Sequence, residues 1–184
     1  NPTSAYHNPF INHSTGVLDF RHYISFWGFK VPDIVVFQFT WNDLPEWSTD
    51  SQITKVVERF KTAIDHIHSM YPNTKIVLSI EPYGSINGNR DWNGKKYTVL
   101  NFAERLISEF EENEYYTSWV KIAPSYACVD LIYGYADTTL VPCSRYNNVT
   151  EHSGGDGVHP SKTGMYQISD CIYPIIHHLL GTIG

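Results

Sequence analysis

The chain has 184 residues, of which 42% are hydrophobic and 17% charged, and its formal net charge is −6. This length fits one domain of ordinary size, and the composition excludes a disordered chain. The negative charge argues against a nucleic-acid-binding protein, which presents a basic face to phosphates, and no run of residues approaches the roughly 20 apolar residues of a membrane span.

The first third of the chain contains one predicted strand and one predicted helix. Residues 1–30 are polar and aromatic and are interrupted by Gly and Pro, so we expect irregular structure there. Residues 34–39 form a nearly continuous apolar run, which is typical of a strand buried on both faces of a parallel sheet. Apolar residues then recur at helical spacing over 51–71, which predicts a helix with one buried stripe.

The rest of the chain continues this alternation. We expect further strands at 75–80 and 120–123, and further helices at 100–110 and from about 161 onward. A polar loop is predicted from the second strand to about Lys96, and a long loop from about Tyr133 to Gly157. Pro174 falls within the last helix and is expected to kink or split it.

Alternating strands and helices predict an α/β protein with a parallel sheet. In such sheets the residues that carry chemistry gather at the carboxyl ends of the strands. Asn42 follows the first predicted strand, Glu81 follows the second, and the loop that ends in His159 follows the third. We therefore expect these three sets of side chains at one edge of the sheet.

Asp156 and His159 form the sharpest motif, on a glycine-containing turn directly before the last helix. A carboxylate three residues before a histidine can accept the imidazole Nδ1–H and fix the tautomer, which leaves the other ring nitrogen free to take a proton from a hydroxyl. Such strings are also frequent by chance. The alternative is a turn in which Asp156 caps backbone amides and His159 lies at the surface.

Asn42 lies at the end of the first predicted strand, within Thr40-Trp41-Asn42-Asp43. A side-chain amide in this position can donate to an oxyanion in a site that the sheet has pre-organised. The alternative is ordinary turn chemistry, because Asn and Asp are common in turns.

Together and in this order, the two motifs resemble those of the SGNH (GDSL-like) hydrolase family. The third block of that family is Gly-x-Asn-Asp, which 40–43 match except that Thr40 replaces the glycine, and its fifth block is Asp-x-x-His, which 156–159 match. The flanking sequence is also similar to that of the family, and the resemblance spans nearly the whole chain. It is carried by Asn8-Pro9-Phe10, Thr15-Gly16, Asp19-Phe20, Pro32-Asp33, Pro160-Ser161, Gly164 and Asp170.

The resemblance implies a flavodoxin-like three-layer α/β/α fold, of which residues 1–184 are the C-terminal portion of a single domain without its first two strands. It implies hydrolysis of acyl esters, acetyl esters included, through an acyl-enzyme and without a cofactor or metal. Asn42 would be an oxyanion-hole donor, His159 the general base and Asp156 its orienting carboxylate. The habits of the family and the aromatic content favour a carbohydrate substrate and an extracellular, cell-surface or virion-associated protein.

The blocks that carry the nucleophilic serine and an oxyanion-hole glycine are missing from the N-terminal part of the chain. Thr49-Asp50-Ser51 resembles the serine block superficially, but no buried strand precedes it, and Asp50 or Ser51 is expected to be a helix N-cap. Gly84-Ser85 follows the wrong strand. We therefore expect an upstream segment or a second chain to supply the serine and to pair with 34–39, because soluble proteins avoid open apolar edges.

Several other readings stay open. A glycan- or receptor-binding module without catalysis would use the same fold, and an acyltransferase would use the same residues but exclude water. A metal site of His152, Asp156 and His159 ranks below the triad, because zinc needs three convergent ligands with ordered partners. His66 and His68 are two residues apart on a helix and make a poor metal pair, and His177-His178 sit near a helix C-terminus.

The chain has three cysteines, so at least one lacks a partner within the chain. Cys128 and Cys143 flank a loop-rich stretch and are candidates for a disulfide. Cys171 falls in a helical pattern and is expected to be a small buried hydrophobe.

Overall fold

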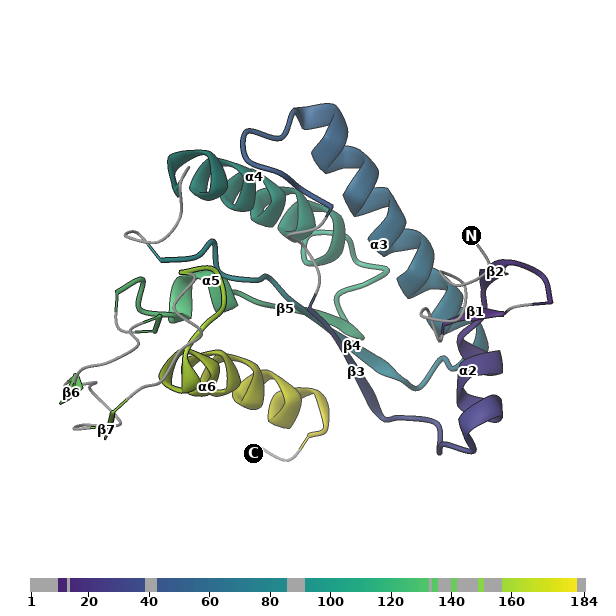
Figure 1. Cartoon of the computed structure of the whole chain (residues 1–184). Helices are drawn as coiled ribbons and strands as arrows, with labels where there is room; N and C mark the ends of the chain where they lie inside the picture. The colour runs from purple at the N-terminus through teal and green to yellow at the C-terminus, as the bar shows by residue number, and fades with distance from the viewer. Residues whose placement is uncertain are drawn as a thin grey trace.

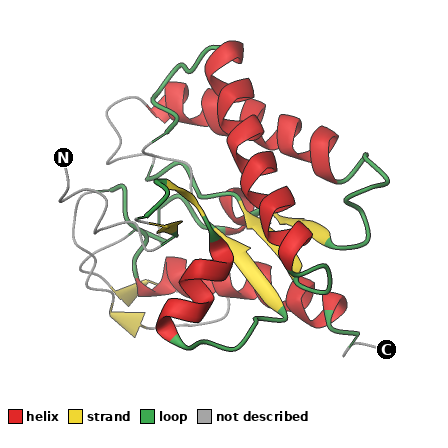
Figure 2. Cartoon of the chain, turned by 90° about the vertical axis from the view of Figure 1, so that its right-hand side faces the viewer, coloured by secondary structure: helices red, strands yellow, loops and turns green. Residues whose placement is uncertain are grey.

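The computed structural model describes residues 10–12, 14–38, 43–85, 92–132, 134–135, 140–141, 149–150 and 157–181. The protein is a mixed α/β structure with a three-stranded parallel sheet in the order β3-β4-β5 (Figures 1 and 2). The strands are β3 (Ile34–Phe37), β4 (Lys75–Ser79) and β5 (Val120–Ala123). The expected α/β class and parallel strands are confirmed.

Helices lie on both sides of this sheet (Figure 1). Helices α3 (Asp50–Met70) and α4 (Trp92–Phe110) pack against each other on one side, where α4 also contacts β5. Helix α6 (Lys162–Leu179) lies on the other side against β4 and β5, and the short α5 (Ser125–Cys128) packs against α6. The predicted helix at 51–71 and the predicted start of the last helix are confirmed.

The main core fills the space between the sheet and the α3/α4 pair. Because side chains alternate across a strand, Ile76, Leu78, Val120 and Ile122 all face this side, and each is at most 7% exposed. The helices contribute the apolar stripes that the sequence predicts. From α3 and α4 these are Ile53, Val56, Val57, Ile64, Ile67, Val99, Phe102, Ala103, Leu106 and Phe110.

Helix α3 begins one or two residues earlier than predicted, because Thr49 is its N-cap rather than Asp50 or Ser51. The Thr49 backbone is extended, and its hydroxyl accepts the Gln52 backbone N–H at 3.3 Å. The Gln52 side chain accepts the Thr49 N–H at 2.8 Å in return, which completes a capping box. Ser51 is therefore a residue of the first turn of α3, as expected for a helix start and not for a nucleophile.

The prediction of irregular structure over residues 1–30 is wrong in its second half. Strands β1 (Ile11–Asn12) and β2 (Val17–Leu18) pair in a small antiparallel hairpin, and α2 (Phe20–Trp27) follows. The Asp19 carboxylate accepts the His22 N–H at 2.9 Å and caps α2, and Gly28 ends it in the left-handed conformation. Aromatic and β-branched residues dominate α2, and these residues have low helix propensity. The helix was therefore overlooked, although the residues that cap its two ends indicate it.

Two further predictions about helices are wrong. Helix α4 begins at Trp92, so the polar loop after β4 does not extend to Lys96. Helix α6 is continuous through Pro174, so the predicted split is wrong, whereas the alternative of a kink at Pro174 stays a prediction. The buried residues Thr163, Gly164 and Ile168 anchor the first half of α6. Short strands β6 (Leu140–Val141) and β7 (Val149–Thr150) pair within the predicted long loop.

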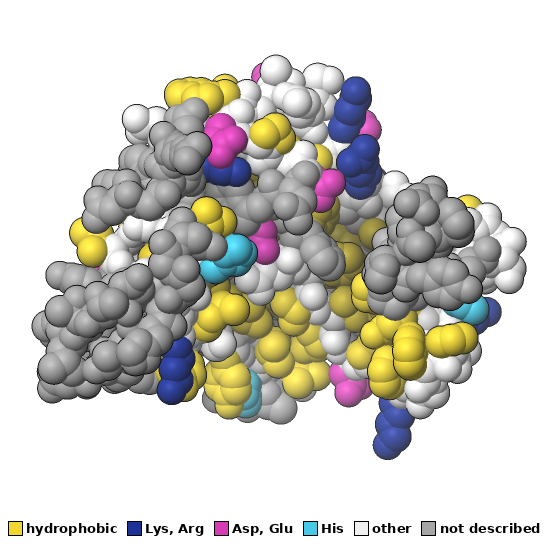
Figure 3. Space-filling view, viewed as in Figure 1, with side chains coloured by type: hydrophobic (Ala, Val, Ile, Leu, Met, Phe, Trp, Pro, Cys, Tyr) yellow, Lys and Arg dark blue, Asp and Glu magenta, His cyan; other side chains and the backbone are white. Residues whose placement is uncertain are grey.

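Strand β3 is at an edge of the sheet and is not buried on both faces as predicted. Val35 and Phe37 pack against the main core, but Val36 points to the opposite face and is 39% exposed. Figure 3 shows hydrophobic side chains at the surface on this side of the molecule, between α6 and α2. The apolar sequence of β3 is therefore only half covered by the described part of the chain.

Candidate active site

The carboxyl ends of the three parallel strands meet at one edge of the sheet. Asp43 lies a few residues beyond β3, Glu81 follows β4, and α5 follows β5 at this edge. The expected position of Asp43 and Glu81 after parallel strands that end at one edge is thus confirmed, whereas a contact between these side chains and His159 stays a prediction. Asn42 and Asp156 lie outside the described residues, so their predicted roles stay predictions.

His159 is exposed on the turn that leads into α6. Gly157 adopts a positive φ of 67°, a conformation that residues with a side chain rarely adopt, which explains the glycine two residues before the histidine. The Ser85 backbone N–H donates to the Gly157 carbonyl at 2.6 Å. This hydrogen bond ties the His159 turn to the loop after β4 and so to the carboxyl edge of the sheet.

The start of α6 is also held by contacts with the backbone of Gly134. Ser161 is the N-cap of α6, and its own backbone N–H donates to the Gly134 carbonyl at 2.7 Å. Gly164 lies so close to Gly134 that a Cβ atom would come within 2.3 Å of the Gly134 oxygen. Only glycine allows this approach, and the first turn of α6 therefore holds His159 in a defined position.

Polar and phenolic groups around this edge are mostly buried. The hydroxyl oxygens of Ser79 and Ser125 lie 2.8 Å apart and link the end of β4 to α5. Burial raises the pKa of Tyr83 and of Tyr135, so both phenols stay protonated near neutral pH. Neither tyrosine is therefore suited to act as a base near neutral pH.

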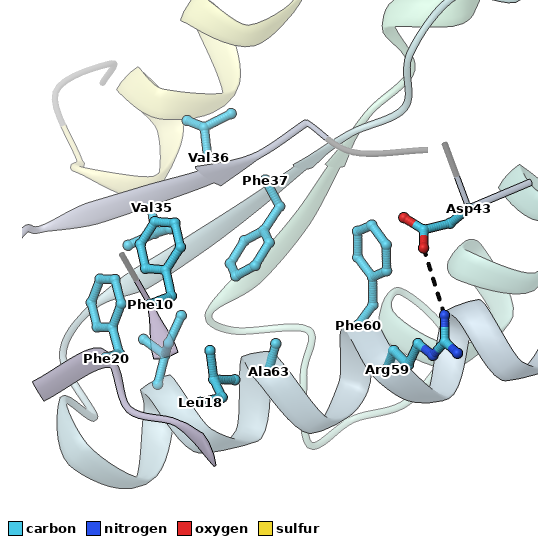
Figure 4. A pocket seen from close by; sticks show the side chains of 11 residues that line it. Phe10, Leu18, Phe20, Val35, Val36, Phe37, Asp43, Arg59, Phe60 and Ala63 are labelled. Carbon is cyan, nitrogen blue, oxygen red and sulfur yellow. Dashed lines mark ion pairs between the residues drawn. The ribbon is translucent and has the colours of Figure 1, made fainter. Parts of the chain in front are cut away.

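The residue after Asn42 is held by helix α3. An Asp43 carboxylate oxygen lies 3.6 Å from an Arg59 guanidinium nitrogen, and both side chains are largely exposed. Such an exposed ion pair contributes little stability. Figure 4 shows this pair at one end of a pocket that runs along β3.

That pocket has a volume of about 300 Å³ and is predominantly apolar. It lies between β3, α3 and the N-terminal hairpin, and Figure 4 shows Val35 and Phe37 pointing into it while Val36 points away. Its other apolar lining residues are Phe10, Leu18, Phe20, Phe60, Ala63 and Ile67. Sequence reasoning did not find this pocket, because the hairpin and α2 that form its wall were predicted to be irregular.

The other histidines that the sequence singled out have structural roles. His66 Nε2 accepts the Phe20 backbone N–H at 3.2 Å and so anchors the start of α2. The His68 ring stacks on Trp119, with ring centres 3.8 Å apart. His177 and His178 occupy the last turn of α6, as expected. The prediction that His66 and His68 make a poor metal pair agrees with these separate contacts.

No group of three or more His, Cys, Asp or Glu side chains with metal-binding geometry occurs among the described residues. His152 and Asp156 of the alternative metal site lie outside them, so that alternative is untested. Ser85, which the sequence analysis set aside because it follows the wrong strand, lies close to the turn that carries His159. It is 7% exposed, and its backbone contacts the turn that carries His159.

No family model matches this chain, and no curated protein or solved structure matches it either. None of the helices in the described part is long and apolar enough to span a membrane. The site must therefore be interpreted from its own residues.

Proposed function

We propose that this protein is a serine esterase of the SGNH type that hydrolyses acyl esters, acetyl esters included, through an acyl-enzyme. The observation that carries the proposal is the position of His159, exposed on a turn that two hydrogen bonds fix at the carboxyl edge of a parallel sheet. The motif order, with Asn42 after β3 and Asp156-x-x-His159 before α6, supports the same reaction.

Each residue has a role that its chemistry fits. His159 takes the proton of the nucleophilic hydroxyl and later returns it to the leaving alcohol. Asp156 orients the imidazole and stabilises its protonated form. The Asn42 amide donates to the oxyanion of the tetrahedral intermediate, where charge develops only in the transition state. A carbohydrate ester and an extracellular, cell-surface or virion setting are the expected context.

The nucleophilic serine belongs, in this proposal, to an upstream segment or a second chain that pairs with β3. The Lys75 N–H donates to the Asp33 carbonyl, so by alternation the main-chain groups of Val35 and Phe37 face β4, and those of Ile34 and Val36 face outward. Ile34 and Val36 have no main-chain partner in the described part of the chain. An added apolar strand satisfies these groups, fills the pocket beside Val35 and Phe37, and covers Val36.

The experiment combines turnover with covalent labelling. The 184-residue chain is purified alone and after coexpression with the sequence encoded immediately upstream of Asn1, and both are assayed with p-nitrophenyl acetate and a fluorophosphonate probe. We expect aggregation or no turnover from the chain alone, and turnover with a labelled serine on the added segment. A stable monomer of the chain alone that hydrolyses the ester would contradict the supplied serine.

Two matched variants locate the nucleophile if the chain alone reacts. Ser85→Ala tests the serine beside the His159 turn, and Ser51→Ala tests the serine in the first turn of α3. We expect both variants to keep full turnover in the complemented protein. A complemented protein that binds glycans but neither reacts with the probe nor hydrolyses esters would instead support the non-catalytic binding module.

A further inference from the structure

Two cysteines that are far apart in the sequence lie on neighbouring helices. Cys128 is the last residue of α5 and is exposed, and Cys171 lies within α6 and is partly buried. Helices α5 and α6 pack against each other, and Val129, which follows Cys128, lies in one apolar cluster with Ile168 and Ile172, on either side of Cys171.

The start of α5 is anchored to the sheet. Ser125, one turn before Cys128, is fully buried, and its hydroxyl oxygen lies 2.8 Å from the Ser79 hydroxyl on β4. The helix that carries Cys128 is therefore held in place against α6, the helix that carries Cys171.

We propose that Cys128 and Cys171 form a disulfide when the protein meets a disulfide oxidant such as oxidised glutathione. Cys143 lies outside the described residues, so the Cys128–Cys143 pairing that the sequence suggested stays a prediction, and the packing of α5 on α6 favours Cys171 as the partner of Cys128. The proposed disulfide closes the segment 129–170, which carries the β6/β7 hairpin and the turn with His159. The inference does not depend on the proposed esterase function.

The chemistry balances as two successive thiol–disulfide exchanges. The Cys128 thiol loses its proton, and its sulfur attacks oxidised glutathione, which breaks the glutathione S–S bond and releases one reduced glutathione. The Cys171 sulfur, after losing its proton, attacks the Cys128 sulfur of the mixed disulfide and releases the second reduced glutathione. Overall two thiols are oxidised and one glutathione disulfide is reduced.

The different environments of the two thiols set the order of the steps. Cys128 is exposed, so the oxidant reaches it first. Burial raises the pKa of the Cys171 thiol to about 12, so this thiol is mostly protonated near neutral pH and reacts slowly with an external oxidant. We therefore expect a mixed disulfide on Cys128 whose conversion to the intramolecular disulfide becomes faster as the pH rises.

The test equilibrates the whole chain, with its complementing segment where needed, in mixtures of oxidised and reduced glutathione. Free thiols are then blocked with N-ethylmaleimide, and the protein is digested without reduction. Trypsin alone leaves Cys128 and Cys143 on one peptide, 122–145, so Asp-N is added to separate them before Asp130 and Asp137. We expect a linked pair of peptides 122–129 and 170–184, with Cys143 alkylated.

Three serine variants complete the experiment. Cys143→Ser keeps the cross-link, whereas Cys171→Ser leaves Cys128 as a mixed disulfide with glutathione. Oxidation should raise the unfolding midpoint by roughly 5–10 °C in the wild type and in Cys143→Ser, but not in Cys128→Ser or Cys171→Ser. A cross-link from Cys128 to Cys143, or full alkylation of all three cysteines in the most oxidising mixture, would overturn the proposal.

Discussion

The two outer strands of the sheet, β3 and β5, differ in how their free edges are satisfied. On β5 the outward-facing Val120 N–H donates to the Tyr116 carbonyl at 2.8 Å, and the Ile122 N–H donates to the Glu111 carboxylate at 3.0 Å. On β3 the outward-facing main-chain groups of Ile34 and Val36 have no such partner among the described residues. One edge of the sheet is satisfied by the chain itself, and the outward-facing groups of the other have no partner among the described residues.

The faces of the sheet show the same contrast at a single register position. Val36 on β3 is paired directly with Val77 on β4, so both point to the side on which α6 lies. Val77 is fully buried, whereas Val36 is 39% exposed. The comparison teaches that an equally apolar residue is buried on the central strand and exposed on the edge strand, so the proposed partner strand would remove the difference.

The largest effect is expected from His159→Ala in the protein complemented along β3. If His159 is the general base, this substitution should lower kcat by on the order of 10⁴-fold, because removing a triad member leaves only binding and oxyanion stabilisation. The measurement is steady-state hydrolysis of p-nitrophenyl acetate. His177→Ala, in the last turn of α6, is the matched control and should keep normal turnover. Near-normal hydrolysis by His159→Ala would reject the assignment.

The next effect compares the paired valines directly. Val77→Ala should lower the free energy of unfolding by about 2 kcal/mol, because it removes buried methyl groups and leaves a cavity. Val36→Ala should lower it by less than about 1 kcal/mol in the chain alone, since that side chain is already exposed. Urea unfolding measures both values.

Complementation then sharpens this comparison. When a strand covers β3, the loss for Val36→Ala should rise toward the loss for Val77→Ala. If the two variants lose equal free energies of unfolding in the chain alone, Val36 is already covered there. The inference that β3 is an open edge would then be wrong.

The sequence predicted the buried strands and helices better than it predicted the edge strand β3. Strands β4 and β5 and helix α3 were predicted nearly to their ends, because their apolar residues and caps lie within one segment and report local burial. The exposure of Val36 on β3 could not be predicted from its apolar sequence. Whether an apolar side chain on a strand is buried depends on which elements lie beside that strand in space. The overlooked helix α2 had readable signals in Asp19 and Gly28, but its aromatic residues gave no helical preference.

The site was predicted in part for the same reason. His159 was placed correctly on a turn before the last helix, since Gly157, the histidine and the Ser161 cap are adjacent in the sequence. The contact of Ser85 with Gly157 and the packing of α5, which carries Cys128, on α6, which carries Cys171, could not be predicted. Each joins segments that are distant in the sequence, and spacing alone does not determine which of three cysteines meet.

A smaller effect is expected from Glu111→Ala, which would make the edge of β5 resemble that of β3. The Ile122 N–H would lose its carboxylate acceptor, and the free energy of unfolding should fall by about 1–2 kcal/mol. Hydrogen exchange at the Ile122 amide should become faster at the same time. Glu111→Gln, which keeps an acceptor oxygen, and Glu112→Ala, which alters the exposed neighbour, should both have smaller effects. Equal losses for all three variants would show that Glu111 does not close this edge.

The smallest effect concerns Asp19, which caps α2 beside the open edge. Its carboxylate accepts the His22 N–H and an Asn12 side-chain N–H, and these bonds lower the pKa of Asp19. Because the folded pKa lies below the unfolded one, the stabilisation is present above the ordinary value of 3.8 and is lost as the pH falls through the folded pKa. Asp19→Ala should lower the free energy of unfolding by about 1 kcal/mol near neutral pH.

The pH profile separates the charge of Asp19 from its capping oxygen. Asp19→Asn keeps an oxygen for the His22 N–H but loses the charge and the bond from Asn12, so its stability near neutral pH should lie between those of the wild type and Asp19→Ala. The difference between the wild type and Asp19→Asn, measured by urea unfolding, should shrink as the pH falls below the folded pKa, because the wild-type side chain is then also neutral. A difference that stays constant across this range would show that the charge of the Asp19 carboxylate does not contribute to the stability that capping of α2 provides.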